Sequence, residues 1–251
     1  MLYLIGLGLG NEKDITLQGL EIIHSCDMVY LENYTSKLQC SVEDLERLYR
    51  KKIIQANRET AEQGADKIIT EAQKNNVAFL VIGDPFSATT HVELFRLAYE
   101  KKVPVKVVNN ASVLTAMGIV GLELYKFGRT ISIPFFEDHP QLESPYNLLR
   151  ANRLLDMHTL VLLDLKTEQQ KFMAIPEALE ILETIEKRKQ ENVIKDSMIA
   201  IGCARLGSDD YLIRAARWKD LKKVDFGKPP HCLIIPGKLH FLEEEMLELW
   251  K

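Results

Sequence analysis

The chain contains few cysteines, and none of them forms a motif. Cys26, Cys40, Cys203 and Cys232 are far apart and no CxxC occurs, which argues against a zinc knuckle or a thioredoxin-like redox site. HExxH, GxSxG, SxxK and P-loop motifs are also absent, so nothing supports a zinc protease, a serine hydrolase or a kinase. Scattered free thiols are typical of a reducing compartment, and we expect a cytoplasmic location.

The chain also lacks long apolar runs and a large excess of either basic or acidic residues. No apolar run approaches the length of a membrane span, and the apolar opening Met1–Ile5 lacks the basic residues of a signal peptide. The chain has 32 Lys and Arg against 36 Asp and Glu, which argues against a protein that coats nucleic acid with a basic face. We therefore expect no nucleic-acid partner and no membrane.

Apolar strand-like runs alternate with helix-like patterns through the first half of the chain. The segment 58–75 places apolar residues on one helical stripe, at Ala61, Ala65, Ile68, Ile69 and Ala72. Strands are expected at residues 2–7, 28–31, 77–82 and 105–108. Nearly continuous apolar strands between amphipathic helices predict an α/β fold with a mostly parallel sheet that is covered on both faces.

The residue composition of the chain changes after residue 133, where three prolines occur close together. Pro134, Pro140 and Pro145 fall among charged residues, which indicates an exposed crossing between domains. The sequence therefore predicts two α/β domains, 1–133 and 134–251. In the second, helices are expected around 147–155 and 175–185 and at the end of the chain. Strands are expected at 159–163 and 232–235, with a hairpin of 197–202 and 211–217.

Glycines follow the first predicted strand, at Gly6, Gly8 and Gly10. A dinucleotide fingerprint needs G-x-G-x-x-G, but Asn11 stands at its third glycine position. Asp27 or Glu32 would be the ribose-binding acid of such a site. The alternatives are a tight strand-to-helix turn and a loop whose backbone closely approaches another ligand.

Polar residues follow the next strands of the predicted sheet. Asp84, directly after the most apolar strand, could bind a hydroxyl or an ammonium group or cap the next helix. Ser112 could cap a helix or donate to a ligand. His231 stands at a strand entry beside Pro229 and Pro230. Ligands of open α/β sheets bind at the carboxyl ends of the strands, so these loops are the candidate site.

Taken together, the loops resemble the tetrapyrrole-methylase fold and, within it, the diphthine synthase family. The motifs that carry the resemblance run through the whole chain. They are Leu4-Ile5-Gly6-Leu7-Gly8-Leu9-Gly10, Asp14-Ile15-Thr16-Leu17, Leu31-Glu32-Asn33-Tyr34-Thr35-Ser36, Gly83-Asp84-Pro85, Ala88-Thr89-Thr90-His91, Asn110-Ala111-Ser112, Gly121-Leu122-Glu123-Leu124-Tyr125-Lys126-Phe127-Gly128 and His231-Cys232-Leu233-Ile234-Ile235-Pro236-Gly237. The compact length resembles the archaeal form of the family.

The resemblance implies an S-adenosyl-L-methionine-dependent methyltransferase whose cofactor cleft lies between the two α/β domains. It implies S-adenosyl-L-homocysteine as product, a homodimer, and translation elongation factor 2 as protein substrate. The acceptor would be the amino group on a modified histidine of that factor. The donor-binding residues implied are Leu9, Asp84, Ser87, Ser112, Val113, Leu163, Ala204 and His231. The sequence does not identify a catalytic base, and no metal site is expected.

Three other functions stay open. A corrin or sirohaem precursor methyltransferase would share the fold, although its glycine loop usually carries a proline where this chain has Leu9. A ribosomal RNA ribose methyltransferase is disfavoured because basic and aromatic residues are not clustered. A non-enzymatic nucleotide-sensing scaffold is the third.

Overall fold

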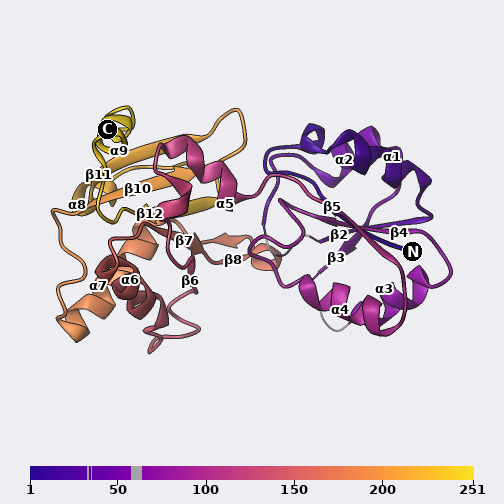
Figure 1. The fold of residues 1–251 in the computed structure, drawn as a ribbon, viewed down its shortest axis with the longest axis horizontal. Coiled ribbons are helices and arrows are strands. Elements are labelled where there is room, and N and C mark those ends of the chain that lie inside the picture. Colours follow the sequence, from indigo (N-terminus) through magenta and orange to yellow (C-terminus); the bar gives the residue numbers. More distant parts are fainter. Residues whose placement is uncertain (33, 35, 58–63) are drawn as a thin grey trace. The chain divides into compact units, whose positions relative to one another are not determined.

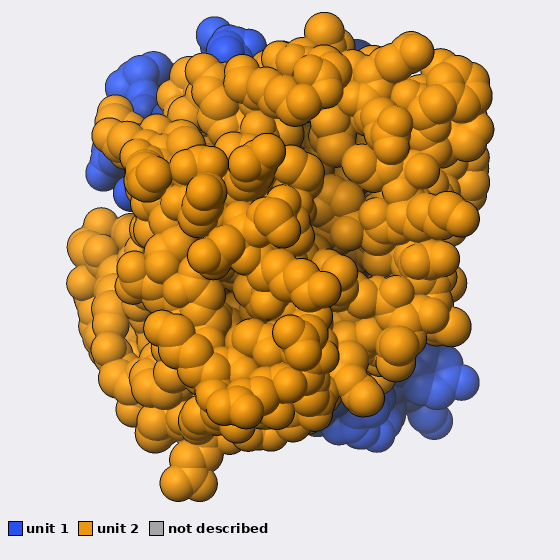
Figure 2. All heavy atoms as spheres, turned by 90° about the vertical axis from the view of Figure 1, so that its left-hand side faces the viewer, with its two compact units in different colours: residues 1–116, 207–209 blue, residues 117–206, 210–251 orange. Residues whose placement is uncertain are grey.

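The structure is a computed structural model that describes residues 1–32, 34, 36–57 and 64–251. It divides into two compact units, which Figure 2 colours separately. Unit 1 comprises residues 1–116 and 207–209, and unit 2 comprises residues 117–206 and 210–251. The two units are described one at a time.

Unit 1 is built on a parallel sheet of five strands in the order β3-β2-β4-β1-β5 (Figure 1). The strands are β1 (Leu2–Gly6), β2 (Met28–Glu32), β3 (Ile54–Ala56), β4 (Val77–Val81) and β5 (Val105–Val108). Gly6 is in register with Val81 and Ile5 with Val108. The carboxyl ends of β4, β1 and β5 therefore lie at one edge of the sheet, and the predicted parallel sheet is confirmed.

Helices cover both faces of this sheet (Figure 1). One core lies beneath α1 (Leu17–Ser25) and α2 (Val42–Tyr49), and the other beneath α3 (Ala65–Ala72) and α4 (Val92–Glu100). Ala65, Ile68, Ile69 and Ala72 of the predicted stripe are buried, while Ala61 lies outside the described residues. The apolar spacing of the sequence thus gives α3 its buried face.

Unit 2 holds a second five-stranded sheet, in the order β11-β10-β12-β7-β6. Its strands are β6 (Ile131–Ile133), β7 (Thr159–Leu163), β10 (Ile199–Ala204), β11 (Leu212–Arg217) and β12 (His231–Ile235). All neighbours are antiparallel except β6 and β7. The antiparallel pair β10–β11 confirms the predicted hairpin. A short hairpin, β8 (Leu165–Lys166) and β9 (Lys171–Phe172), follows β7.

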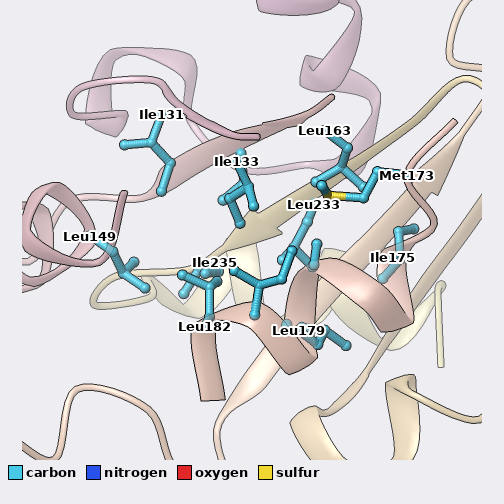
Figure 3. Close-up of a cluster of buried hydrophobic side chains, with 14 of the residues drawn as sticks. Ile131, Ile133, Leu149, Leu163, Met173, Ile175, Leu179, Leu182, Leu233 and Ile235 are labelled. Carbon is cyan, nitrogen blue, oxygen red and sulfur yellow. The ribbon is translucent and has the colours of Figure 1, made fainter. Parts of the chain in front are cut away.

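The main core of unit 2 lies between this sheet and its helices. In Figure 3, Leu163 of β7 lies beside Met173, and Leu233 and Ile235 of β12 lie toward Leu179 and Leu182 of α7. The helices that contribute to this core are α6 (Ser144–Leu154), α7 (Ile175–Lys189) and the short α8 (Trp218–Leu221). Unit 2 also contains α9 (Phe241–Glu248), which has no residue in this cluster. A four-residue helix, α5 (Val113–Ala116), ends unit 1.

The predicted domain boundary at residue 133 falls inside unit 2. Ile131–Ile133 forms β6 and pairs with β7, so the second sheet begins before the proline-rich segment. Pro145 occupies the first turn of α6, where its missing N–H leaves no hydrogen bond unmade. Pro134 and Pro140 therefore belong to the connection between β6 and α6, and the compact units separate at Ala116 and Met117.

Candidate functional site

The glycine loop after β1 is held against the end of β4. The Gly83 N–H donates to the Gly8 carbonyl at 2.8 Å, and the Gly8 N–H donates to the Gly83 carbonyl at 3.2 Å. Gly8 has a φ of +78°, and a Cβ there would lie 2.6 Å from Asp14 Cβ, so only glycine fits. Leu9, a predicted donor contact, is half-buried on this loop.

Asp84 joins the loop after β4 to the loop after β5. Its Oδ1 accepts from the Phe86 N–H and the Ser87 hydroxyl, each at 3.0 Å. Its Oδ2 accepts from Asn109 Nδ2 at 2.9 Å and from the Asn110 N–H at 3.2 Å. A carboxylate offers about four acceptor positions, so donors of the chain itself engage most of its capacity.

The environment of Asp84 favours its ionised form. Burial to 7 % exposure raises the pKa of the carboxyl, but the hydrogen bonds from Asn109, Phe86, Asn110 and Ser87 outweigh burial and hold the pKa below its ordinary value. The carboxylate is therefore negative at neutral pH, and its charge fixes the two loops in place.

Ser112 and Val113 stand at the beginning of α5. The buried Ser112 Oγ accepts from the Leu114 N–H at 3.2 Å, and the Ser112 carbonyl accepts from the Ala116 N–H at 2.8 Å. Ser112 therefore caps the short helix, as one of its two predicted roles required. Leu9, Asp84, Ser87, Ser112 and Val113 all follow the carboxyl ends of β1, β4 or β5, so the structure gathers them at one sheet edge.

Two residues that sequence reasoning did not select complete this edge. Asn110 Nδ2 donates to the carbonyl of Gly6 at 2.9 Å and to that of Asp14 at 3.0 Å. Asp14 Oδ2 accepts from the Gly10 N–H at 2.7 Å. Both residues stand in motifs of the family resemblance, but their own signal was weak: an amide two residues after β5 and an acid four residues after the last glycine.

The three predicted residues of unit 2 also lie side by side. Ala204 is in register with His231, and Cys232 with Leu162, which places His231 beside Leu163. Leu163 ends β7, His231 begins β12 and Ala204 ends β10. These three positions form a row across neighbouring strands at one edge of the second sheet.

His231 is a neutral side chain at physiological pH. Its Nε2 lies 3.1 Å from the Lys228 carbonyl, so the tautomer that donates from Nε2 satisfies this contact. Burial lowers the pKa of His231, and it outweighs the opposing effect of the Lys228 and Gly227 carbonyls. The ring can therefore offer an uncharged surface beside Leu163 and Ala204.

The acids considered for a dinucleotide site have other roles. Glu32 is fully buried at the end of β2, and its carboxylate accepts from the N–H groups of Tyr34 and Ile82. Asp27 precedes β2 at the amino edge of the sheet and accepts from the Asn76 N–H at 2.8 Å. Neither is placed to bind a ribose at the glycine loop, so the dinucleotide interpretation is not supported.

The chain matches a known enzyme family over most of its length. Residues 1–222 match the family of Tetrapyrrole (Corrin/Porphyrin) Methylases. Diphthine methyl ester synthase of Dictyostelium discoideum is 43% identical, and the match covers 100% of this chain and 98% of that one. This chain belongs to the diphthine synthases of the tetrapyrrole methylase family. The human diphthine methyl ester synthase is likewise 43% identical over 100% of this chain and 95% of its own.

Solved structures agree with this membership. A crystal structure of a proposed diphthine synthase from Entamoeba histolytica superposes with a TM-score of 0.93 at 43% identity, covering 100% of this chain and 98% of that one. The expected fold and family are thus confirmed, and the chain is a methyltransferase of the diphthine synthase type. A corrin or sirohaem precursor methyltransferase is not favoured. The Dictyostelium and human relatives are eukaryotic, and the archaeal type stays a prediction.

A membrane-spanning role finds no support in the part of the chain that is described. Among those residues, no helix is both long and apolar enough to cross a bilayer.

Proposed function

We propose that this chain methylates the modified histidine of translation elongation factor 2, with S-adenosyl-L-methionine as donor. The observation that carries the proposal is full-length similarity to diphthine methyl ester synthases. An ester forms on a carboxylate oxygen. The names of the relatives therefore add a carboxylate acceptor to the amino group that the sequence resemblance implied, and we propose that this chain acts on both.

The residues of the unit 1 sheet edge fit such a donor. Gly83, with a φ of +84°, is buried between loops, and a Cβ there would lie 3.7 Å from both Ala111 O and Leu9 Cδ2. Leu9 and Val113 offer apolar contacts, and both are half-buried. When bound, the donor supplies an electrophilic methyl group on a sulfonium. Asp84 orders the loops around it through the four hydrogen bonds described above.

The contribution that these residues can make to methyl transfer is to position the donor and the acceptor. Holding donor and acceptor in line can contribute about 7–11 kcal/mol in well-aligned systems, and no covalent enzyme intermediate is needed. Leu9, Val113, Leu163 and Ala204 do not titrate, so their contribution is shape and exclusion of water. A carboxylate acceptor needs no base, whereas an amine acceptor has to release its proton, which we assign to solvent.

Mass spectrometry of the protein substrate tests the proposed function. The purified chain is incubated with adenosylmethionine and elongation factor 2 that carries the unmethylated modified histidine. We expect several methyl groups on that residue, and mild alkali should remove one of them, because esters hydrolyse and N-methyl groups do not. Methyl transfer that needs no modified factor, or no transfer at all, would refute the proposal.

The proposal keeps two further expectations from the sequence, a homodimer and a cytoplasmic location. Light scattering should give twice the chain mass of 28.7 kDa at micromolar concentration. A mass of one chain would contradict the homodimer and leave the proposed reaction untouched.

A further inference from the structure

We propose that Asp14 and Asn110 are positioning residues that hold the glycine loop, Gly6–Gly10, in the form that receives the methyl donor. This inference rests on the proposed function, because it assigns that loop to the donor. Neither residue needs to touch the donor. They affect donor binding indirectly, because they hold the backbone of the glycine loop in place.

Asn110 ties three segments of unit 1 together. Its Nδ2 donates to the carbonyls of Gly6 at 2.9 Å and Asp14 at 3.0 Å, and its Oδ1 accepts from the Ala111 N–H at 2.7 Å. Its own N–H donates to Asp84. The side-chain amide thus donates one hydrogen bond to the start of the glycine loop and one to the segment that follows the loop.

Asp14 holds the other end of the loop. Its Oδ2 accepts from the Gly10 N–H at 2.7 Å, and its Cβ lies 2.6 Å from the position that a Cβ of Gly8 would take. The side chain therefore lies directly against the loop while one oxygen fixes the last glycine. Asn110 holds the first glycine and Asp14 the last.

The composition of the loop explains why it needs these two residues. Three of its five positions are glycine, and glycine loses more backbone freedom on ordering than any other residue. If the loop is already ordered, donor binding does not have to order it. If the loop is disordered, the free energy of ordering it weakens donor binding. Ground-state and transition-state binding weaken equally, so KM should rise while kcat changes little.

The experiment compares Asp14→Ala, Asn110→Ala and the conservative Asp14→Asn with the unaltered chain. Asp14→Asn keeps an oxygen that can accept from Gly10. Asp27→Ala is the matched control, because it removes a carboxylate that accepts one backbone N–H at 2.8 Å at the opposite edge of the same sheet. Calorimetry gives the Kd of adenosylhomocysteine, kinetics give KM and kcat, and hydrogen exchange reports on the Gly6–Gly10 amides.

We expect Kd and KM to rise about tenfold in Asp14→Ala and Asn110→Ala, equivalent to about 1.4 kcal/mol. Exchange of the loop amides should accelerate, and kcat should stay within about threefold of the unaltered value. Asp14→Asn should restore most of the affinity. Asp27→Ala should leave donor affinity unchanged even where it lowers the melting temperature.

The possible failures are distinct. If the unaltered chain does not bind adenosylhomocysteine, the proposed function is wrong. If it binds, and Asp14→Ala and Asn110→Ala bind equally well, the positioning role is wrong. Asn110→Asp covers the case in which an alanine variant fails to fold, because it keeps the Ala111 contact and loses both donated hydrogen bonds. Normal affinity in a folded Asn110→Asp variant would overturn the inference.

Discussion

At the scale of single residues, the candidate site depends on side chains that bind other parts of the chain. Asp84 accepts four hydrogen bonds from two loops, and Ser112 caps α5. The sequence placed both residues at the site because polar side chains follow buried strands. The sequence could not reveal that their side-chain oxygens accept hydrogen bonds from the protein itself, because these contacts depend on how loops from separate parts of the chain pack together.

The first prediction concerns Asp84→Ala. Removing a charged hydrogen-bond acceptor costs about 1.5–3 kcal/mol, and here it also releases the loops after β4 and β5. We expect a lower unfolding free energy together with donor affinity reduced at least tenfold, measured by urea titration and calorimetry. Ser87→Ala removes one of the four donors and serves as the milder comparison. A folded Asp84→Ala chain with unchanged affinity would remove Asp84 from the site.

At the scale of secondary structure elements, the sequence predicted those with a strong apolar pattern and missed the others. Apolar runs, continuous in β4 and interrupted only by Lys106 in β5, predicted these strands. In contrast, β3 is a short edge strand with two exposed residues, Ile54 and Gln55, and leaves no such signal. Helix α2 could have been found, because Ser41 and Asp44 form a capping box. The prolines after β6 resemble a linker in sequence, but only the pairing of β6 with β7 shows where unit 2 begins.

Helix α9 is attached to unit 2 by a buried carboxylate. Glu243, 1% exposed, accepts from His158 Nε2 at 3.0 Å, the Glu123 N–H at 2.9 Å and the His240 N–H at 2.8 Å, and it pairs with Lys126. Burial raises the pKa of Glu243, but these partners outweigh burial and lower the pKa to about 2. The carboxylate is therefore charged throughout the neutral range.

The second prediction is that Glu243→Gln destabilises the chain in a pH-dependent way. Removing one partner from a buried ion pair costs about 3–5 kcal/mol. Because the folded pKa is depressed, the stabilisation by Glu243 is complete above 4.5, its ordinary value, and is lost as the pH falls toward about 2. Urea unfolding of both proteins between neutral and acidic pH checks this. An equal difference at every pH would show that the charge of Glu243 is not responsible.

The hairpin β10–β11 depends on one guanidinium group. Arg205 Nε donates to Asp210 Oδ2 at 2.8 Å, its Nη2 to the Asp210 carbonyl at 2.8 Å, and its Nη1 to the carbonyls of Phe226 and Lys228. These bonds join the end of β10 to the segment before His231. The planar fork of arginine fits this arrangement, and a lysine ammonium cannot reproduce it.

The third prediction therefore uses Arg205→Lys. We expect the variant to lose about 1–3 kcal/mol of unfolding free energy, because the buried Phe226 carbonyl and the carbonyls of Lys228 and Asp210 lose their donor. Donor affinity should fall as well, since Ala204 and His231 adjoin the disturbed segments. Lys223→Arg, at an exposed ion pair with Asp220, is a matched control that should change neither quantity. A stable Arg205→Lys chain with unaltered affinity would contradict the role given to this group.

At the scale of the whole molecule, each compact unit presents its predicted residues at one sheet edge. The strand register explains both sets of residues. In unit 1, strands β1, β4 and β5 end at the same edge of the sheet. In unit 2, the pairing of β12 with β7 and with β10 places Leu163, His231 and Ala204 in a row. Sequence resemblance predicted these residues one by one. The grouping arises from strand pairing between distant parts of the chain, which local patterns do not encode.

The fourth prediction is that donor ligands stabilise the chain and dinucleotides do not. A ligand that binds only the native state at 100 times its Kd adds about 2.7 kcal/mol. For a chain of this size that amounts to a rise in Tm of roughly 5–10 °C. Adenosylhomocysteine should give this shift in a thermal melt. NAD should give much less at equal concentration, because no acid is placed for its ribose: Glu32 is engaged in the core and Asp27 lies at the opposite sheet edge. A larger shift with NAD would restore the dinucleotide interpretation of the glycine loop, and no shift with either ligand would contradict adenosylmethionine as the donor.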